Sequence, residues 1–579
     1  MITEIEFKRT GHTLLNNGII GLYKYLVKAK NEDFFDFPFE FELTNNKLTI
    51  TSDKLPQLLD DIYYWMGKEV YDTYTIKQQE NAEKFQECNI FYDRAENKFF
   101  PFPRMYTYGL THLLTNNAQG VTRHEKGWTN AKKLEKSDPE ELAKFVNFFE
   151  TSGLKILSKL YYEPYTKITR IPKLKESFLN EGDRKCYLTG ESYDELVDVT
   201  NISPFFSGLF NFNSYLSAGD KKISWKTRYL SMFSPVNAYY HYSNKLRDTI
   251  HIYLVSSDNL KNLNELISKI EIQDSTPVLR KKEFVSNIKF AEEIEKDSFT
   301  EQFEVAIALI YSMYKKAILK YGNISENQFA DDELFGEVMT KIPPLAIESF
   351  KAESFASTMR PNTYENLNRL TPLFKLFHDV EKSGIVFSRF LSSLKLLKPS
   401  ERAASNKYRL ERILRNQISR EILELKSILP SIEDLFFRSY NYLCINEPIG
   451  FKDFKQLFLF TQLYELKIKT MEESLQNAAI TLGKQIGVKM RHQDASQSEA
   501  ANAKRGRGDL ITLRKARTQK QFLDELIRID FKYGLTVNEE LAGKINEQNY
   551  YSIKQFLIIG ALNILNPAIQ PIKKTEKTA

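Results

Sequence analysis

The amino-acid sequence predicts an α+β fold, in which a mixed α/β N-terminal domain is followed by a mainly helical C-terminal bundle. Near the N-terminus, alternating aromatic and acidic residues stand beside an Asn-Asn pair, a pattern typical of a β-hairpin. In the second half, apolar residues recur at intervals of three and four, which is typical of amphipathic helices. A chain of 579 residues exceeds what one hydrophobic core usually serves. We therefore expect three domains, at residues 1–295, 296–470 and 471–579.

The N-terminal domain is expected to start with a helix and a hairpin. A periodic apolar segment predicts the helix at 14–27, after a turn at Gly11-His12. The hairpin strands are FPFEFEL and KLTIT, which an Asn45-Asn46 turn connects. A second helix is expected at 55–73, and a Ser-Asp-Pro sequence predicts the start of a third at 139–160.

From about Ser298 onward the pattern is helical. The segment 403–429 carries apolar residues spaced by three and four, and Pro430 is expected to end this helix because proline cannot continue one. The polar segment QDASQSEAANAKRGRG is expected to lead into a later helix at 509–531. The other predicted helices lie at 302–321, at 451–486 as one long helix or two, and at 552–565.

Composition excludes several classes of protein. Hydrophobic residues make up 42% of the chain and charged residues 27%, which is typical of globular rather than disordered proteins. The three cysteines, Cys88, Cys186 and Cys444, stand far apart, so no disulfide framework is indicated and a reducing compartment fits. The N-terminus has no apolar signal-peptide core, and no apolar run is long enough to cross a bilayer. We therefore expect a cytoplasmic protein.

The net charge of +6 is concentrated in one C-terminal stretch. Between Lys484 and Lys532, twelve Lys or Arg oppose six Asp or Glu, so the rest of the chain is close to neutral. Such a stretch is a candidate phosphate-binding surface, although a solvated helix face would have the same composition. Three arginines are spaced to share a helical face if the helix begins near Gly506, and Gly506 and Gly508 would let the backbone approach a ligand. The candidate residues are Lys504, Arg505, Arg507, Arg514, Lys515 and Arg517.

Two further segments are candidate binding sites. A loop at 115–130 combines amide side chains, which can bind base edges, with cations, which neutralise phosphates, although a plain surface loop would look the same. In the segment 205–228, five aromatic residues precede clustered cations, which suits base stacking but suits a core between domains better. The candidate residues are Asn116, Asn117, Gln119, Arg123 and Lys126 in the loop, and Lys221, Lys222, Lys226 and Arg228 in the second segment.

No catalytic motif is found. The sequence lacks a Walker A loop, a GxGxxG that opens a helix, HExxH and GxSxG. His378-Asp379 is an HD dipeptide such as occurs in metal phosphohydrolases, but no second His/Asp cluster completes a metal site, so an ordinary helix residue is the simpler interpretation. We therefore expect no enzyme activity, no cofactor and no metal.

Three segments together resemble one protein family. They are GHTLLNNGIIGLYKYL near the start, RKCYLTGES followed by NISPFFSGLFNFNSYLSAG in the middle, and GRGDLITLRKARTQKQFLDELIRI near the end. The family is that of the CXXC-CXXC-region (Cst-type) proteins, the large subunits of type I-B CRISPR surveillance (Cascade) complexes, and the resemblance extends over the whole chain. One departure concerns the paired CxxC motifs, because only Cys186 is kept, Thr189 stands where the second cysteine would be, and no second pair exists. Hydrogen bonds of the turn, rather than zinc, are therefore expected to hold this loop.

The resemblance implies a non-catalytic subunit of a guide-RNA complex. Such subunits recognise the protospacer-adjacent motif in duplex DNA, help to open it and stabilise the displaced strand, while guide pairing reads the sequence. The implied partners are the crRNA-bearing Cascade backbone and foot subunits, target duplex DNA, the displaced single strand, and a helicase-nuclease recruited after R-loop formation. The 116–126 loop would read the motif, and the basic C-terminal helices would hold single-stranded DNA. Related systems also make a helical small subunit from an internal start, for which Met471 and Met490 are candidates.

Two alternatives stay open on the sequence alone. One is a stand-alone nucleic-acid-binding or scaffold helical protein, which would bind without guide dependence. The other is a degenerate nuclease with a metal site near His378.

Overall fold

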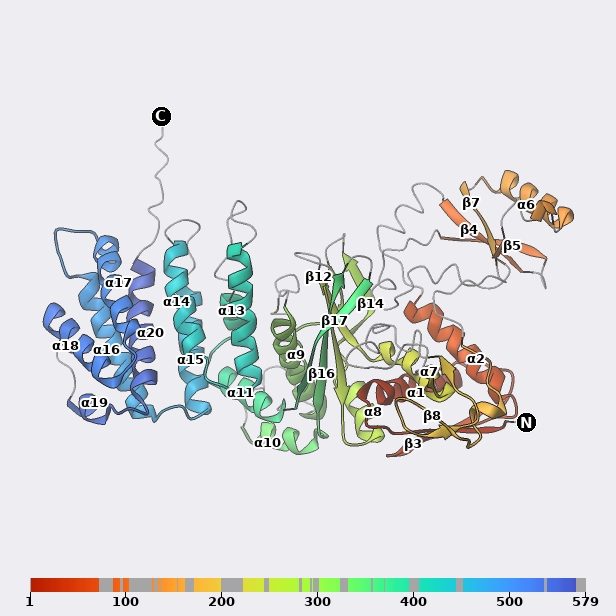
Figure 1. The fold of residues 1–579 in the computed structure, drawn as a ribbon, viewed down its shortest axis with the longest axis horizontal. Helices are drawn as coiled ribbons and strands as arrows, with labels where there is room; N and C mark the ends of the chain where they lie inside the picture. Colours follow the sequence, from red (N-terminus) through yellow and green to blue (C-terminus); the bar gives the residue numbers. More distant parts are fainter. Residues whose placement is uncertain are drawn as a thin grey trace. The chain divides into compact units, whose positions relative to one another are not determined.

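The computed structural model describes residues 2–71, 87–93, 97–103, 128–129, 134–136, 138–153, 155–161, 171–198, 222–243, 249–280, 284–291, 294, 301–322, 332–355, 358–368, 370–394, 406–443, 451–535 and 539–568. The chain forms two compact units, one of Met1–Lys289 and Ile342–Asn368 and the other of Phe290–Lys341 and Arg369–Ala579. We call them the N-terminal unit and the C-terminal unit. The first combines sheets with helices and the second is helical over its described residues, so the predicted α+β fold is confirmed (Figure 1).

The predicted hairpin is present at the start of the N-terminal unit. Its strands are β2 (Glu40–Leu43) and β3 (Lys47–Thr51), with Phe41 opposite Ile50. A third strand that was not predicted, β1 (Glu4–Lys8), pairs with the other side of β3, so the sheet order is β1-β3-β2. The alternation of charged and apolar residues in β1 buries Ile5 and Phe7, as expected for a strand with one face in the core.

Helix α1 (Thr13–Asn31) is longer than the predicted 14–27 and contacts both a helix and a strand of the same unit. A methyl group on Gly18 would lie 2.1 Å from the carbonyl oxygen of Leu230 in α7 (Trp225–Phe233), so glycine is what allows the two helices to come this close. The buried amide of Asn17 donates to the carbonyl oxygen of Val255 in β13 (Thr249–Ser256) at 2.8 Å. Helix α1 therefore holds the helices and the large sheet together.

The large sheet is antiparallel and has the order β14-β15-β12-β13-β16-β17. Its last two strands come from residues 346–367, inside the segment predicted to be a helical domain. The first of them, β16, pairs with β13, and β17 pairs with β16 to complete the sheet of the N-terminal unit. The prediction missed them because both strands are rich in charged and polar residues. The new elements are β12 (Tyr239–Ser243), α8 (Leu260–Lys269), β14 (Gln273–Arg280), β15 (Phe284–Ile288), β16 (Ala346–Phe355) and β17 (Thr358–Leu367).

A smaller sheet of order β5-β4-β7-β6 replaces the end of one predicted helix. Helix α6 (Pro139–Ser152) starts where expected, with the Asp138 side chain accepting from the Glu141 amide at 3.0 Å. It ends eight residues before residue 160, because Gly153 adopts a left-handed conformation with φ of 63° and residues 155–161 then form β7. The other strands are β4 (Glu87–Asp93), β5 (Lys98–Pro103) and β6 (Trp128–Thr129).

The rest of the N-terminal unit consists of short elements. Helix α2 (Leu55–Met66) is followed by one π-helical turn at Gly67–Tyr71, which together cover most of the predicted 55–73 helix. Strands β8 and β9 form a short antiparallel pair on either side of the Cys186 turn. A second antiparallel pair joins β10 to β11, which directly precedes α7. Their bounds are β8 (Arg184–Lys185), β9 (Ser192–Tyr193), β10 (Val197–Asp198) and β11 (Lys222–Ile223), and a 3-10 turn at Glu176–Phe178 precedes them.

The C-terminal unit is built from helices α9 to α20 over its described residues. They are α9 (Gln302–Gly322), α10 (Asp332–Lys341), α11 (Leu370–Lys382), α12 (Phe387–Ser393), α13 (Asn406–Leu423), α14 (Leu429–Leu443), α15 (Phe451–Lys467), α16 (Glu473–Arg491), α17 (Glu499–Lys515), α18 (Gln519–Tyr533), α19 (Glu539–Lys544) and α20 (Tyr550–Ala568). The predicted helix at 302–321 is confirmed by α9. No described helix is long and apolar enough to span a membrane.

Two predicted helix boundaries in this unit are wrong. Pro430 does not end a helix but is the second residue of α14, where its missing N–H costs no helical hydrogen bond. The helix before it has already stopped at Leu423, and Leu425 has a left-handed φ of 54°. The polar segment before residue 509 is also largely helical, because Ser498 caps α17 and the helix runs on to Lys515. Thr518 then caps α18, so a turn at 516–518 interrupts the predicted 509–531 helix.

Helix α20 is the centre of the bundle. It contacts α14, α15, α16, α17 and α18, and nearly all of its side chains from Ile553 to Leu562 are buried. Its contact with α16 is made at the level of the backbone, because a methyl group on Gly483 would lie 2.1 Å from the carbonyl oxygen of Leu557. A methyl group on Gly487 would lie 2.7 Å from the Ala561 carbonyl oxygen, and one on Gly560 would lie 2.9 Å from that of Ile480. These small residues let α16 pack closely against α20, and the two helices lie side by side (Figure 1).

Candidate nucleic-acid interface

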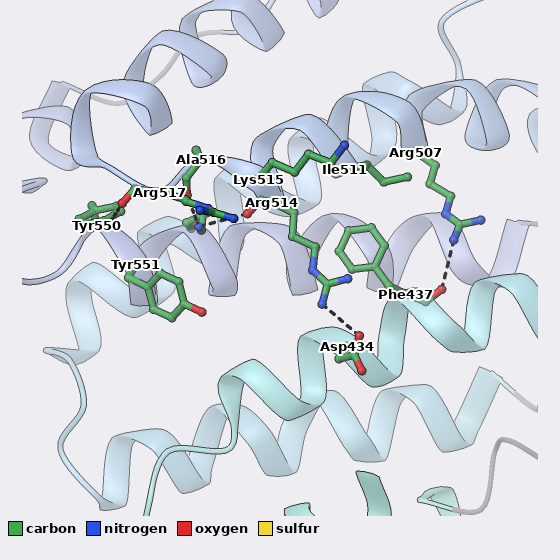
Figure 2. A pocket seen from close by; sticks show the side chains of 11 residues that line it. Asp434, Phe437, Arg507, Ile511, Arg514, Lys515, Ala516, Arg517, Tyr550 and Tyr551 are labelled. Carbon is green, nitrogen blue, oxygen red and sulfur yellow. Dashed lines mark hydrogen bonds and ion pairs between the residues drawn. The ribbon is translucent and has the colours of Figure 1, made fainter. Parts of the chain in front are cut away.

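Four of the six predicted C-terminal cations line one pocket of about 820 Å³ in the C-terminal unit. We call this pocket the basic groove, and helices α14, α17 and α20 supply most of its wall (Figure 2). Its lining contains five cations and one acid. The lining residues are Asp434, Phe437, Arg507, Ile511, Arg514, Lys515, Ala516, Arg517, Tyr550, Tyr551 and Lys554.

The local structure explains how cations gather at the groove. Arg507 and Arg514 are seven residues apart in α17, so they lie two turns apart on one helical face. The prediction that Arg517 shares this helical face is wrong, because α17 ends at Lys515. The turn that follows the helix carries Arg517 into the groove instead. The hydroxyl of Tyr550 donates to the carbonyl oxygen of Arg517 at 2.6 Å and ties this turn to α20.

Arg514 is neutralised within the protein. Its guanidinium makes an ion pair with Glu433 at 2.8 Å. It also pairs with Asp434 at 3.0 Å and lies over the ring of Phe437 with 4.8 Å to the centroid (Figure 2). Burial raises the pKa of Glu433, and the adjacent Arg514 opposes this effect. Arg514 therefore joins α17 to α14 and shapes the groove, rather than offering a free charge to a ligand.

Lys554 also has a structural task. Its side chain is buried, and the ammonium donates to the carbonyl oxygens of Ala516 at 2.6 Å and Arg514 at 3.3 Å. These carbonyls belong to the C-terminal end of α17, where a cation is favourable. Burial lowers the pKa of Lys554, while Glu433 acts in the opposite direction. The ammonium also lies 4.7 Å from the ring centroid of Tyr551.

Lys515 and Arg517 are the cations that a ligand can reach. Both are exposed, and neither side chain has an ion-pair partner among the described residues. Tyr551 stands beside them at the groove with 48% of its surface exposed. Its pKa is raised by partial burial, so the hydroxyl stays protonated. The groove therefore offers cations for phosphates and an aromatic ring for a base, the two elements of a single-strand binding surface.

The other two predicted cations of this stretch lie outside the groove. Arg505 bonds to Gln497 at 3.2 Å and lies 4.0 Å from Asp494, while Lys504 is exposed and does not line the pocket. The predicted role of Gly506 is wrong, because this glycine is buried against Met490, whose Cβ would lie 2.8 Å from an added methyl group. Gly506 serves helix packing, and Gly508 is the one open to solvent.

The predicted N-terminal sites are only partly described. The loop candidates Asn116, Asn117, Gln119, Arg123 and Lys126 lie outside the described residues, as do Lys221 and the aromatic residues at 205–215.

Three cations of the second segment are described. Lys222 is exposed and pairs with Asp198. Lys226 is half-buried, and burial lowers its pKa. Arg228 is 5% exposed, so the prediction that it belongs to a binding surface is wrong, because its side chain is buried in the core of the N-terminal unit.

The turn at Cys186 is held by hydrogen bonds, as expected. The Gly190 amide donates to the Cys186 carbonyl at 2.9 Å, and the Cys186 amide donates to the carbonyl oxygen of Glu191 at 2.8 Å. Burial raises the pKa of the Cys186 thiol, but hydrogen bonds from Thr189 and other neighbours outweigh it, so the pKa is lowered overall.

Two hydroxyl residues that were not predicted to belong to this site lie next to Cys186 and Thr189. Ser224 and Thr227 stand at the start of α7 with the spacing of a CxxC motif. The Cys186 sulfur lies 3.6 Å from the Thr227 hydroxyl, which accepts from Ser224 at 2.9 Å. Cys186, Thr189, Ser224 and Thr227 thus form a hydrogen-bonded cluster of four side chains.

His378 does not form part of a metal cluster in the described part of the chain. Its Nε2 lies 3.0 Å from Asp332, and its ring stacks on Phe335 at 4.1 Å. The neighbouring Asp379 pairs with Lys467 at 2.8 Å and so faces another helix. These contacts are those of a residue that fixes α11 against α10.

The groove residues of α14 and α20 were not found from the sequence, because they stand far from the basic stretch and carry no motif. They are Asp434, Phe437, Tyr550, Tyr551 and Lys554.

No family model matches this chain, and a comparison with curated proteins finds no similar sequence.

Proposed function

We propose that this chain is a non-catalytic, nucleic-acid-binding subunit and, following the resemblance of its sequence, the large subunit of a type I-B Cascade complex. It would recognise the protospacer-adjacent motif in duplex DNA and stabilise the R-loop for a separate helicase-nuclease in antiviral defence. The observation that carries the proposal is the basic groove, where Lys515 and Arg517 are exposed and unpaired among the described residues beside Tyr551. Among the residues that the structure describes, those of the groove include no cluster of His, Cys, Asp or Glu that could hold a metal.

The charges of the groove favour a phosphate ligand. Arg514 and Lys554 are committed to internal partners, and the half-buried Arg507 donates to the carbonyl oxygen of Phe437 at 3.4 Å. The exposed cations of the groove are therefore Lys515 and Arg517. Each phosphate that a cation neutralises releases condensed counterions, which makes binding favourable and dependent on salt. Because these two cations are separated by one residue, they can follow consecutive phosphates of one flexible strand.

The aromatic ring favours a single strand over a duplex. Tyr551 is half exposed and is held by the ammonium of Lys554. A base can stack on such a ring only when it is not already stacked and paired in a duplex. The displaced strand of an R-loop is the ligand that meets both requirements, since its phosphates and its bases are both accessible.

The helix boundaries around the groove distinguish the two methionines that are candidates for an internal translation start. Met471 lies in the connection between α15 and α16, so a product that begins there would keep α16 to α20 whole. Met490 lies inside α16 and is buried, so a start there would remove the helix that packs most closely on α20. We therefore favour Met471, although such a product would lack the α14 wall of the groove. Expression of the native gene with a C-terminal tag tests this, because a second product of the corresponding mass is expected and its absence contradicts the idea.

The test of the function is binding of duplex DNA by the guide-loaded backbone complex, with and without this chain. The targets carry a fixed protospacer and randomised flanking bases, and bound DNA is sequenced. Tight binding is expected to require both this chain and a few particular flanking bases. Alanine at Asn116, Asn117 and Gln119 then tests the predicted loop, and a loss of flank preference with retained R-loop formation is expected.

The competing function gives a different result in the same experiment. A stand-alone nucleic-acid-binding or scaffold protein would bind DNA equally well without the guide complex and without flank preference. That outcome would overturn the Cascade assignment while leaving the basic groove as a binding site.

A further inference from the structure

A second surface lies on the N-terminal unit, where α1 ends and β2 begins. The segment 31–42 reads NEDFFDFPFEFE and contains five Phe, five Asp or Glu and no Lys or Arg. Together with the facing ring of Trp65 in α2, we call it the acidic–aromatic surface. It takes no part in the proposed function, and the inference drawn from it does not depend on that function.

The end of α1 places Phe34 in one position. The Phe34 amide donates to the carbonyl oxygen of Ala29 at 3.0 Å, and Asp33 has a left-handed φ of 47°, the arrangement of a Schellman motif. The ring of Phe34 then stacks on Trp65 with 4.4 Å between centroids and an interplanar angle of 0°. Trp65 is itself fixed, since its indole N–H donates to Glu69 at 2.8 Å.

Phe34 is nevertheless 49% exposed. One face of its ring is covered by Trp65, so the exposed part includes the opposite face. The aromatic surface continues along the segment, with Phe34 5.0 Å from Phe35 and Phe35 5.7 Å from Phe39, edge to face in both pairs. Phe35 and Phe39 are half-buried. The three rings therefore form one continuous surface that is held in place before any ligand binds and is exposed to solvent on one side.

The charge around these rings is negative. Among the described residues, none of the five acids of the segment has an ion-pair partner. The acids continue onto the sheet, where Glu40 and Glu4 both lie opposite Thr51 and Glu42 lies opposite Thr49. Glu6, on the other side of Thr49, is neutralised by an ion pair with Lys47. Three cations already lie over rings at the edge of this surface: Lys28, which also pairs with Glu69, over Trp65, Lys30 over Phe41 and Lys54 over Phe37. None of them lies over Phe34 among the described contacts.

This combination excludes some ligands and favours one. Phosphates would be repelled by the unpaired carboxylates, so a nucleic acid does not suit the surface despite its aromatic rings. A purely apolar partner would leave the same carboxylates without compensation. A guanidinium group satisfies both features, because it stacks on an aromatic face and pairs with carboxylates.

We propose that the acidic–aromatic surface binds an arginine-bearing basic segment of a partner protein. A guanidinium of that segment stacks on the open face of Phe34, and neighbouring cations pair with the carboxylates of the segment 32–42. The aromatic rings are held in place before binding, which reduces the conformational entropy that the complex loses.

The test uses the full chain and a short fluorescent peptide of alternating arginine and glycine as the probe. A peptide of the same length with citrulline, which keeps the shape but not the charge, is the matched control, and fluorescence anisotropy reports binding. Phe34→Ala is expected to weaken the arginine peptide about fivefold, as for loss of one exposed cation–π contact. Phe34→Tyr keeps the ring and is expected to bind as the unchanged protein does. Asp33→Asn with Asp36→Asn is expected to weaken binding and to flatten its dependence on salt.

Phe531→Ala is the control for exposed aromatic rings elsewhere, because Phe531 is 85% exposed and lies in the C-terminal unit. It is expected to leave peptide binding unchanged, and thermal unfolding confirms that each variant is folded. The proposal is overturned if the citrulline peptide binds equally well, or if Phe34→Ala and Phe531→Ala have the same effect. It is also overturned if Phe34→Ala weakens binding of an oligothymidylate but not of the arginine peptide, which would identify a base-stacking site instead.

Discussion

Replacing Lys515 and Arg517 with glutamine is expected to weaken single-stranded DNA binding and to reduce its dependence on salt. These two side chains are the exposed cations of the basic groove without an ion-pair partner among the described residues, so the double variant removes at most two phosphate contacts. For single strands each contact contributes about 0.7 to the slope of log K against log salt concentration, so the slope should fall by about 1.4. The affinities of the two proteins should then converge near ~1 M salt and differ about 25-fold near ~0.1 M.

The assay is fluorescence anisotropy of a labelled oligothymidylate, titrated at several potassium chloride concentrations. The control is Lys504→Gln with Arg505→Gln, which removes the same charge from the same stretch but outside the groove. A small, uniform change in affinity with nearly the original slope is expected for the control.

Equal slopes for the two double variants would refute the reasoning, since the effect would then follow net charge and not the groove. An unchanged slope for the groove variant would show that its cations touch no phosphate.

Three further predictions concern stability and metal binding. Gly483→Ala should lower the free energy of unfolding by about 1–3 kcal/mol because the added methyl group would lie 2.1 Å from the Leu557 carbonyl oxygen. Gly508→Ala is the control, since it adds a methyl group in open space on α17 and should be neutral or stabilising. Urea unfolding measures both free energies. Asp509→Asn should cost about 1–3 kcal/mol, since the buried carboxylate accepts from Arg528, Lys532 and Tyr533. Burial raises the pKa of Asp509, but these hydrogen bonds outweigh it and lower the pKa overall. The stabilisation by the Asp509 carboxylate is therefore present above about pH 3.9, the pKa of an unfolded aspartate, and is lost as the pH falls toward the folded-state pKa. The stabilities of the two proteins should converge at low pH, and a constant difference would contradict this prediction. A zinc site should form with Cys186 in the triple variant Thr189→Cys, Ser224→Cys, Thr227→Cys. Sulfurs bonded to tetrahedral zinc at about 2.3 Å lie about 3.8 Å apart, and the Cys186 sulfur already lies 3.6 Å from the Thr227 hydroxyl oxygen. Elemental analysis should find one zinc per chain in the triple variant and none in Thr189→Cys alone.

Local sequence patterns predicted those parts of the fold that local interactions determine. The hairpin at β2 and β3 and the helix α9 depend on alternation, on a turn sequence and on a long apolar run, all of which are visible in short segments. Pro430 was misinterpreted because proline is equally suited to the first turn of a helix and to the position after one. The strands β16 and β17 could not be predicted because β16 is stabilised by pairing with β13, almost a hundred residues earlier in the chain, and β17 pairs with β16.

The candidate site shows the same division. The charge surplus identified Arg507, Arg514, Lys515 and Arg517, because they are close together in the sequence. It could not show that Arg514 is neutralised, since Glu433 and Asp434 belong to another helix. Nor could it separate Lys504 and Arg505 from the groove, because composition does not record which face of α17 a residue occupies.

The central place of α20 has a consequence for the synthesis of the protein. Helices α14 to α18 leave the ribosome before α20, yet each of them packs against it. Until residues 550–568 are translated, the faces of these five helices that α20 covers in the folded unit stay open to solvent. Such nascent chains are prone to aggregate or to bind chaperones, so the folding of this unit is completed late. A premature stop codon shortly before residue 550 would therefore be as damaging as one much earlier in the unit.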